Sequence, residues 1–186
     1  MNINIPTWIT LFRLFLIPVM VIVLCWDFLG HRQLGAAVFL LISVSDFWDG
    51  YLARKWNQTS RLGAFLDPVA DKVAVGVCLV LVVYLEPQVY ITVPALAIIG
   101  RELIISGLRE WMADQGLRDS VQVGWIGKWK TTFQTLAIGL LIYKVPSYGV
   151  PWFEGGIVCL YIAAVLTVWS MVQYLVAAWP TLMKGE

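Results

Sequence analysis

Four aspartate residues, spaced as two pairs, are the clearest sign of chemistry in this sequence. Asp46 and Asp49 are three residues apart, and Asp67 and Asp71 are four residues apart. On an α-helix each residue advances by about 100°, so the two members of each pair lie on one face of their helix. Two neighbouring antiparallel helices can therefore direct all four carboxylates to one place. Like charges that close together stay ionised only if something compensates them.

Two divalent cations would balance these four negative charges. All-oxygen ligands select hard ions such as Mg²⁺, Mn²⁺ or Ca²⁺, and paired metal ions are typical of phosphoryl transfer. The alternative is a structural use, in which an acid caps a helix or pairs with Arg54, and a single pair of acids favours that interpretation. Four acids that can share one face, with Gly50 and Gly63 nearby for close approach, favour the metal centre.

The composition places these carboxylates in a membrane protein. Of 186 residues, 60% are hydrophobic and only 13% are charged, with a net charge of +1, whereas a soluble domain has about 45–50% apolar and about 25% charged residues. These values exclude a water-soluble globule and a disordered or fibrous chain, and the charge balance excludes a nucleic-acid-binding protein. The length suits a single domain, residues 1–186.

Six apolar segments are candidates for the helices that must position the carboxylates. Gly155–Met183 is uncharged and long enough to cross about 30 Å of hydrocarbon. The other five have 13 residues each, or about 20 Å as a helix. They are Leu14–Trp26, Gln33–Ser45, Val73–Leu85, Gln88–Gly100 and Thr131–Tyr143. Charged segments that still look helical adjoin these runs, so we expect the helices to extend beyond them.

The charges also predict a topology. If the six helices alternate in direction and the N-terminus is cytoplasmic, eleven of the 13 Lys and Arg residues lie inside, and only Arg32 and Lys144 lie outside, as the positive-inside rule requires. We therefore predict an all-α integral membrane protein with six transmembrane helices and both termini cytoplasmic. Charges within the inner leaflet face a bundle interior or a water-filled cavity, so we expect a polar cavity open to the cytoplasm.

The segment from Asp46 to Asp71 resembles the signature of the CDP-alcohol phosphotransferase family, D-x-x-D-G-x-x-A-R-x(8)-G-x-x-x-D-x-x-x-D, at every fixed position. The resemblance implies that the four aspartates hold two Mg²⁺ or Mn²⁺ ions around the diphosphate of a CDP-linked lipid. It further implies that Asp71 is the general base for the attacking hydroxyl. The residues it implies for binding the CDP-lipid are Thr10, Arg13, Gly50, Arg54, Ser60 and Gly63.

Two further segments, Gly100–Trp111 and Gly127–Thr132, resemble bacterial members of this family that use sn-glycerol 3-phosphate as the acceptor. The resemblance implies transfer of a phosphatidyl group from CDP-diacylglycerol to glycerol 3-phosphate, which yields phosphatidylglycerophosphate and CMP. It also implies a homodimer in the bacterial inner membrane, with the active site facing the cytoplasm.

A dianionic acceptor needs cations near the cavity. The candidates at the expected cytoplasmic helix ends are Arg109, Lys128, Lys130, Arg101 and Arg118. For each of them the alternative is a membrane anchor whose charge reaches the lipid headgroups.

Two other functions stay open from the sequence alone. The same chemistry with serine or an inositol phosphate as the acceptor would need the same carboxylates. A divalent-cation transporter would use them as a midplane site, but the outer halves of the expected helices are almost wholly apolar and offer no polar path through the membrane.

Overall fold

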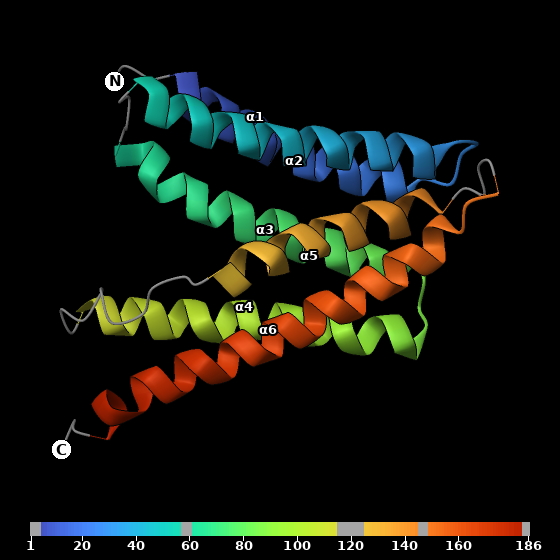
Figure 1. The fold of residues 1–186 in the computed structure, drawn as a ribbon. Helices are drawn as coiled ribbons and strands as arrows, with labels where there is room; N and C mark the ends of the chain where they lie inside the picture. The colour runs from blue at the N-terminus through green and yellow to red at the C-terminus, as the bar shows by residue number, and fades with distance from the viewer. Residues whose placement is uncertain (1–4, 57–60, 115–124, 145–148, 184–186) are drawn as a thin grey trace. The chain divides into compact units, whose positions relative to one another are not determined.

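The computed structural model describes residues 5–56, 61–114, 125–144 and 149–183, and these form six α-helices (Figure 1). The helices are α1 (Ile5–Cys25), α2 (His31–Trp56), α3 (Arg61–Leu85), α4 (Val89–Asp114), α5 (Trp125–Tyr143) and α6 (Trp152–Leu182). The prediction of an all-α protein is therefore confirmed for the described part of the chain.

The helices extend beyond the short apolar runs, as the sequence predicts. Helices α2 and α4 have 26 residues each, which gives them a length of about 39 Å. Asp46 and Asp49 lie inside α2, and Asp67 and Asp71 lie inside α3. Helix α3 runs through Pro68 without interruption. All four aspartates are thus carried by helices rather than by loops.

Four of the helices are long and apolar enough to cross a membrane within the described residues. These segments are Thr7–Cys25, Phe65–Leu85, Val89–Asp114 and Trp152–Trp179. Helix α2 begins with His31 and Arg32 and carries Asp46 and Asp49 towards its other end, and α5 has only 19 residues. The chain is a membrane protein with four candidate spans in α1, α3, α4 and α6.

The chain divides into two compact units, one made of residues 1–86 and 138–153 and the other of residues 87–137 and 154–186. In the first unit α1 packs against both α2 and α3. Gly35 of α2 allows this close packing, because a β-carbon at that position would lie 2.9 Å from Cγ of Leu24. Between α1 and α3, Sγ of Cys78 lies 3.6 Å from Sδ of Met20.

A cluster of ion pairs lies at the end of the first unit that is away from the aspartates. Glu86 is only 5% exposed, and its Oε1 accepts hydrogen bonds from Nη2 of Arg32 at 2.8 Å and from Nζ of Lys144 at 2.5 Å. Arg32 and Lys144 are the two basic residues that the sequence predicts on the outer side. One buried carboxylate therefore partners both of them.

We expect the substitution Glu86→Gln to lower the free energy of unfolding by about 1–3 kcal/mol. Loss of a partner from a fully buried ion pair destabilises by about 3–5 kcal/mol, and the partial exposure of Lys144 reduces this effect. Thermal unfolding of the purified protein in detergent measures the change. Asp27→Asn is the matched control, because Asp27 is exposed at the same end of the unit, and an equal shift in both variants would contradict the prediction.

The second unit contains α4, the first part of α5 and α6. The buried residues of α4 include Ile91, Ala95, Ile98, Arg101 and Ile105, which follow each other at three- or four-residue intervals and so form one face. The other side of α4 exposes apolar residues, among them Val93, Leu96, Leu103 and Ile104. An apolar outer face suits contact with lipid, and Arg101 lies on the opposite, protein-facing side.

Candidate active site

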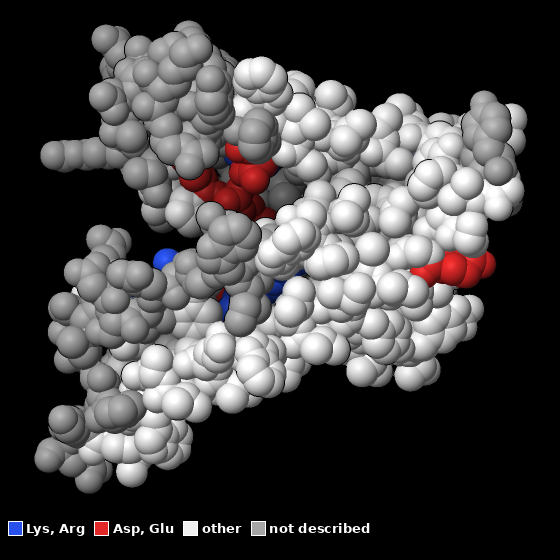
Figure 2. All heavy atoms as spheres, viewed as in Figure 1, with Lys and Arg blue, Asp and Glu red and all other residues white. Residues whose placement is uncertain are grey.

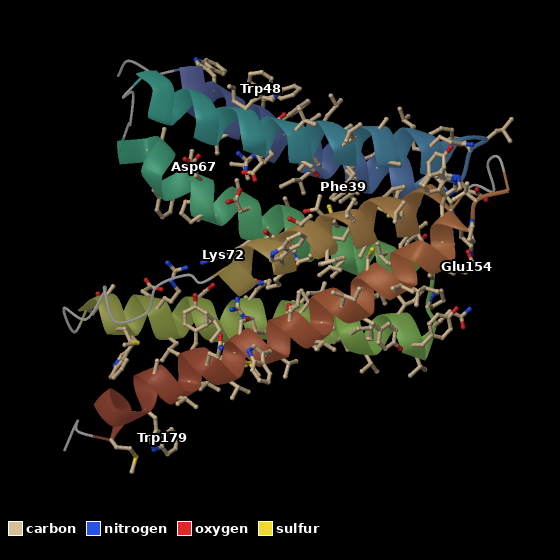
Figure 3. The ribbon with its side chains drawn as sticks, viewed as in Figure 1. Phe39, Trp48, Asp67, Lys72, Glu154 and Trp179 are labelled. Atoms are coloured by element: carbon tan, nitrogen blue, oxygen red, sulfur yellow. The ribbon has the colours of Figure 1, made fainter. Side chains whose placement is uncertain are left out.

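Three of the four aspartates reach a single turn of α1. Oγ1 of Thr10 donates a hydrogen bond of 2.6 Å to Oδ1 of Asp67. Nη1 of Arg13 donates to Oδ1 of Asp46 at 2.5 Å and to Oδ1 of Asp71. Thr10 and Arg13 are three residues apart and share a face of α1, so carboxylates from both α2 and α3 meet at that face. Figure 3 labels Asp67 on the first part of α3.

The cation and the carboxylates of this site differ in their exposure to solvent. Arg13 is almost completely buried, with 1% of its side chain exposed, whereas the side chains of Asp46 and Asp71 are 53% and 51% exposed. Figure 2 shows acidic atoms gathered in an open patch of the surface. The cation therefore lies inside the unit and the carboxylates lie at its surface, where a ligand can reach them.

Several predicted site residues lie outside what the structure describes. Asp49, Gly50 and Arg54 belong to α2, but their side chains are outside the described set, and Ser60 is outside the described residues. Gly63 is buried in α3. Among the described side chains, no three His, Cys, Asp or Glu residues are close enough to hold one metal ion. The centre built from four carboxylates stays a prediction.

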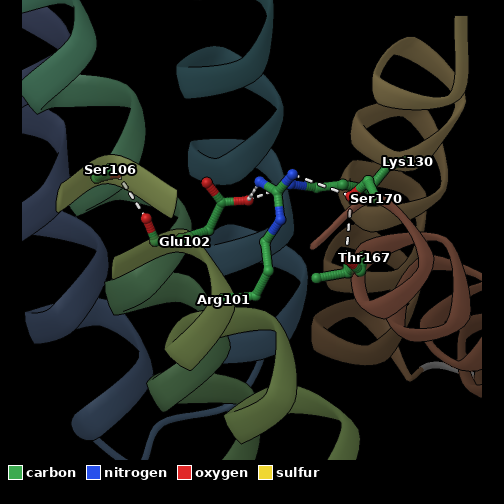
Figure 4. A network of polar contacts seen from close by, with 6 residues as sticks. All are labelled: Arg101, Glu102, Ser106, Lys130, Thr167 and Ser170. Atoms are coloured by element: carbon green, nitrogen blue, oxygen red, sulfur yellow. Dashed lines mark hydrogen bonds and ion pairs between the residues drawn. The ribbon is translucent and has the colours of Figure 1, made fainter. Parts of the chain in front are cut away.

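The predicted acceptor-binding residues occupy different environments. Arg109 is exposed on α4. Lys128 belongs to α5, with its side chain outside the described set, and Arg118 is outside the described residues. Arg101 and Lys130 are 9% and 5% exposed and belong to a polar network inside the second unit (Figure 4).

This network links α4 to α5 and α6. Nζ of Lys130 donates a hydrogen bond to Oε1 of Glu102, which connects α5 to α4. Nη2 of Arg101 donates to Oγ of Ser170 at 2.9 Å, which connects α4 to α6 (Figure 4). The Arg101 guanidinium also lies 5.4 Å from the ring centroid of Tyr174 on α6. Buried cations need such partners because an isolated charge is strongly disfavoured in a protein interior.

The α6 residues of this network are not evident from the sequence. Thr167, Ser170 and Tyr174 lie within the uncharged run Gly155–Met183, where length and hydropathy indicate only a membrane span. Their intervals of three and four residues place them on one helix face, and that spacing is the signal that could have found them. Ser170 also donates to the backbone oxygen of Thr167 at 2.9 Å.

We expect Glu102→Gln to destabilise the protein by about 2–4 kcal/mol, because it leaves the buried Lys130 ammonium without its carboxylate. Thermal unfolding in detergent measures this loss. The double variant Glu102→Gln, Lys130→Met is expected to recover much of the stability, since it removes the buried charge as well. If Glu102→Gln unfolds like the wild type, and only the KM for the acceptor changes, the stabilising role of the pair is wrong.

The sequence matches the CDP-alcohol phosphatidyltransferase family over residues 3–179. This match covers most of the chain, including all four aspartates and the network residues of α4, α5 and α6. The chain belongs to the CDP-alcohol phosphatidyltransferase family.

Named relatives agree with this assignment over nearly the whole length of both chains. A Haemophilus influenzae protein is 49% identical over 186 residues, which is 100% of this chain and 98% of the relative. A Yersinia enterocolitica protein is 50% identical over 184 residues, with 99% and 100% covered. A Salmonella choleraesuis protein is 50% identical over 179 residues, with 96% of each chain covered. Each of the three is named CDP-diacylglycerol–glycerol-3-phosphate 3-phosphatidyltransferase.

Proposed function

We propose that this protein transfers the phosphatidyl group of CDP-diacylglycerol to sn-glycerol 3-phosphate and releases phosphatidylglycerophosphate and CMP. The observation that carries the proposal is the identity of about half of all residues, over the full chain, with relatives named for this reaction. The signature from Asp46 to Asp71 and the meeting of three of its aspartates at one turn of α1 add support.

The carboxylates fit a divalent metal centre by their chemistry. The donor set is made of aspartate oxygens, which hard cations prefer, and the side chains of Asp46 and Asp71 are half exposed. Enzymes of this family generally depend on a divalent cation. Asp46, Asp49, Asp67 and Asp71 would hold two Mg²⁺ or Mn²⁺ ions, which supply positive charge to the diphosphate and so make CMP a better leaving group.

Residues of the protein itself accept the proton and bind the donor. Asp71 accepts the proton of the acceptor hydroxyl as general base. As that hydroxyl oxygen bonds to the lipid-bearing phosphorus, the bond from this phosphorus to the CMP oxygen breaks. The donor is bound by Thr10, Arg13, Gly50, Arg54, Ser60 and Gly63.

The acceptor phosphate is bound by Arg109 and Lys128, because cations recognise a dianion and arginine does so with two hydrogen bonds. Arg101, Lys130 and Arg118 are the further candidates. The partners found for Arg101 and Lys130 in the second unit support a helix-linking role for these two residues beside any contact with the acceptor.

We further propose that residues 1–186 act as one membrane domain with six spans, both termini cytoplasmic and a polar cavity open to the cytoplasm. The four candidate spans and the bias of Lys and Arg to one side support this arrangement. The family resemblance further implies a homodimer in the bacterial inner membrane, and the proposed topology lets the enzyme take its donor from the lipid phase and its acceptor from the cytoplasm.

An acceptor assay tests the proposed reaction. The purified protein is incubated with CDP-diacylglycerol, Mg²⁺ or Mn²⁺, and one of glycerol 3-phosphate, serine or an inositol phosphate, and CMP release is measured. We expect CMP only with glycerol 3-phosphate. CMP release with another acceptor alone would overturn the substrate assignment. Metal uptake into sealed vesicles that lack CDP-lipid would favour a transporter instead.

A further inference from the structure

We propose that Arg13 is the built-in counter-cation of the metal-binding aspartates, so that a divalent metal and the Arg13 guanidinium compete for the same carboxylates. This inference rests on the proposed metal centre and adds a specific role for a residue of α1. When metal binds, Arg13 leaves Asp46 and Asp71, and its charge becomes available to the diphosphate of the donor.

The contacts of Arg13 carry the inference. Its side chain is 1% exposed, and Nη1 bonds both to Asp46 of α2 and to Asp71 of α3. Arginine stays protonated in proteins, so this buried positive charge is permanent. The carboxylates of Asp46 and Asp71 compensate this buried charge. The guanidinium in turn holds the two carboxylates close together.

The same geometry sets up the competition. A single nitrogen of Arg13 contacts one oxygen of each carboxylate, and those oxygens belong to the proposed metal ligands. The positive charge of Arg13 repels an incoming divalent ion. Its hydrogen bonds also occupy two carboxylate oxygens that the ion would use as ligands. Removing that charge therefore strengthens metal binding, although it weakens the protein in the absence of metal.

Thr10 offers a matched comparison on the same face of α1. Its hydroxyl donates to Asp67 at 2.6 Å, so it also occupies a carboxylate oxygen of the site, but it carries no charge. Thr10→Val removes this hydrogen bond without changing the net charge of the site. A difference between Arg13→Gln and Thr10→Val thus separates the effect of charge from the effect of a lost contact.

Metal binding to the purified protein in detergent, without CDP-lipid, tests the proposal. Free Mn²⁺ is measured by electron paramagnetic resonance for the wild type, Arg13→Gln, Arg13→Lys and Thr10→Val. We expect Arg13→Gln to bind Mn²⁺ about tenfold more tightly than the wild type. We expect Arg13→Lys, which keeps the charge, and Thr10→Val to stay within about threefold of it. Equal or weaker Mn²⁺ binding by Arg13→Gln would overturn the proposal.

A second measurement uses the wild-type chain and does not depend on the folding of a variant. Phenylglyoxal modifies accessible arginines, and peptide mass analysis reports modification at Arg13. We expect slow modification without metal, because Arg13 is buried, and faster modification with Mn²⁺. A rate that Mn²⁺ leaves unchanged or lowers would reject the exchange of partners.

The outcomes separate this inference from the proposed function. Wild-type protein that binds no Mn²⁺ would overturn both the metal centre and the role of Arg13. Wild-type protein that binds Mn²⁺ with an affinity insensitive to Arg13→Gln would overturn the role of Arg13 alone and leave the metal centre in place.

Discussion

Replacing Asp71 with asparagine is expected to lower kcat by at least about 10³-fold, because the acceptor hydroxyl loses its general base and the proposed metal centre loses a ligand. The fold should survive, since an asparagine side chain has nearly the size of the aspartate and Arg13 retains its ion pair with Asp46. CMP release at saturating CDP-diacylglycerol and glycerol 3-phosphate measures the loss.

The control for this prediction is Asp114→Asn, which removes an exposed carboxylate at the end of α4. It should keep the activity of the wild type, and both variants should unfold at temperatures close to that of the wild type. Activity of Asp71→Asn within about tenfold of the wild type would reject the role of Asp71 as a base, because a positioned base contributes about 10²–10⁴-fold.

Removal of divalent metal is the second change with a large expected effect. With EDTA we expect CMP release to fall to background, since no divalent cation then compensates the charge of the diphosphate, and Arg13 stays paired with Asp46 and Asp71. We also expect excess Mg²⁺ to raise the Tm by about 5–10 °C. This estimate follows from about 2.7 kcal/mol of stabilisation at a ligand concentration of 100 Kd and about 2–4 °C per kcal/mol for a chain of this size.

The Tm shift has its own control in the proposed ligand set. In Asp67→Ala the shift caused by Mg²⁺ should drop below about 2 °C, because fewer carboxylates remain to bind the ion. Turnover should be abolished in this variant as well. A Tm that responds equally to Mg²⁺ in Asp67→Ala and in the wild type would show that the ion stabilises the protein from another place.

The positions of the aspartates on helices could be predicted from the sequence, because spacing within a helix fixes which side chains share a face. The pairs Asp46–Asp49 and Asp67–Asp71 lie in α2 and α3, as expected. Spacing does not reveal which residue of a third helix meets them. Resemblance alone assigns Arg13 to the lipid donor, and its ion pairs with Asp46 and Asp71 depend on the packing of α1 against α2 and α3, which no local pattern encodes.

The polar network of the second unit shows the same limit. The sequence identifies Arg101 and Lys130 as charges at helix ends, where a substrate contact and a membrane anchor are the two interpretations. The structure adds a third interpretation, a contact that links helices. Arg101 donates a hydrogen bond to Ser170, and Lys130 donates one to Glu102. Ser170 lies in an apolar run, and its polar role follows only from the neighbour that it faces.

The burial of Arg13 also bears on how the chain is assembled during translation. Helix α1 is synthesised before α2 and α3, so Asp46 follows Arg13 only 33 residues later and Asp71 only 58 residues later. At about 5–20 residues per second the ribosome needs several seconds to deliver Asp71. An unpaired arginine opposes entry into hydrocarbon by about 2.5–3.5 kcal/mol. The first helix is therefore expected to be loosely held at the translocon until α2 supplies Asp46, and to be fixed in place when α3 supplies Asp71.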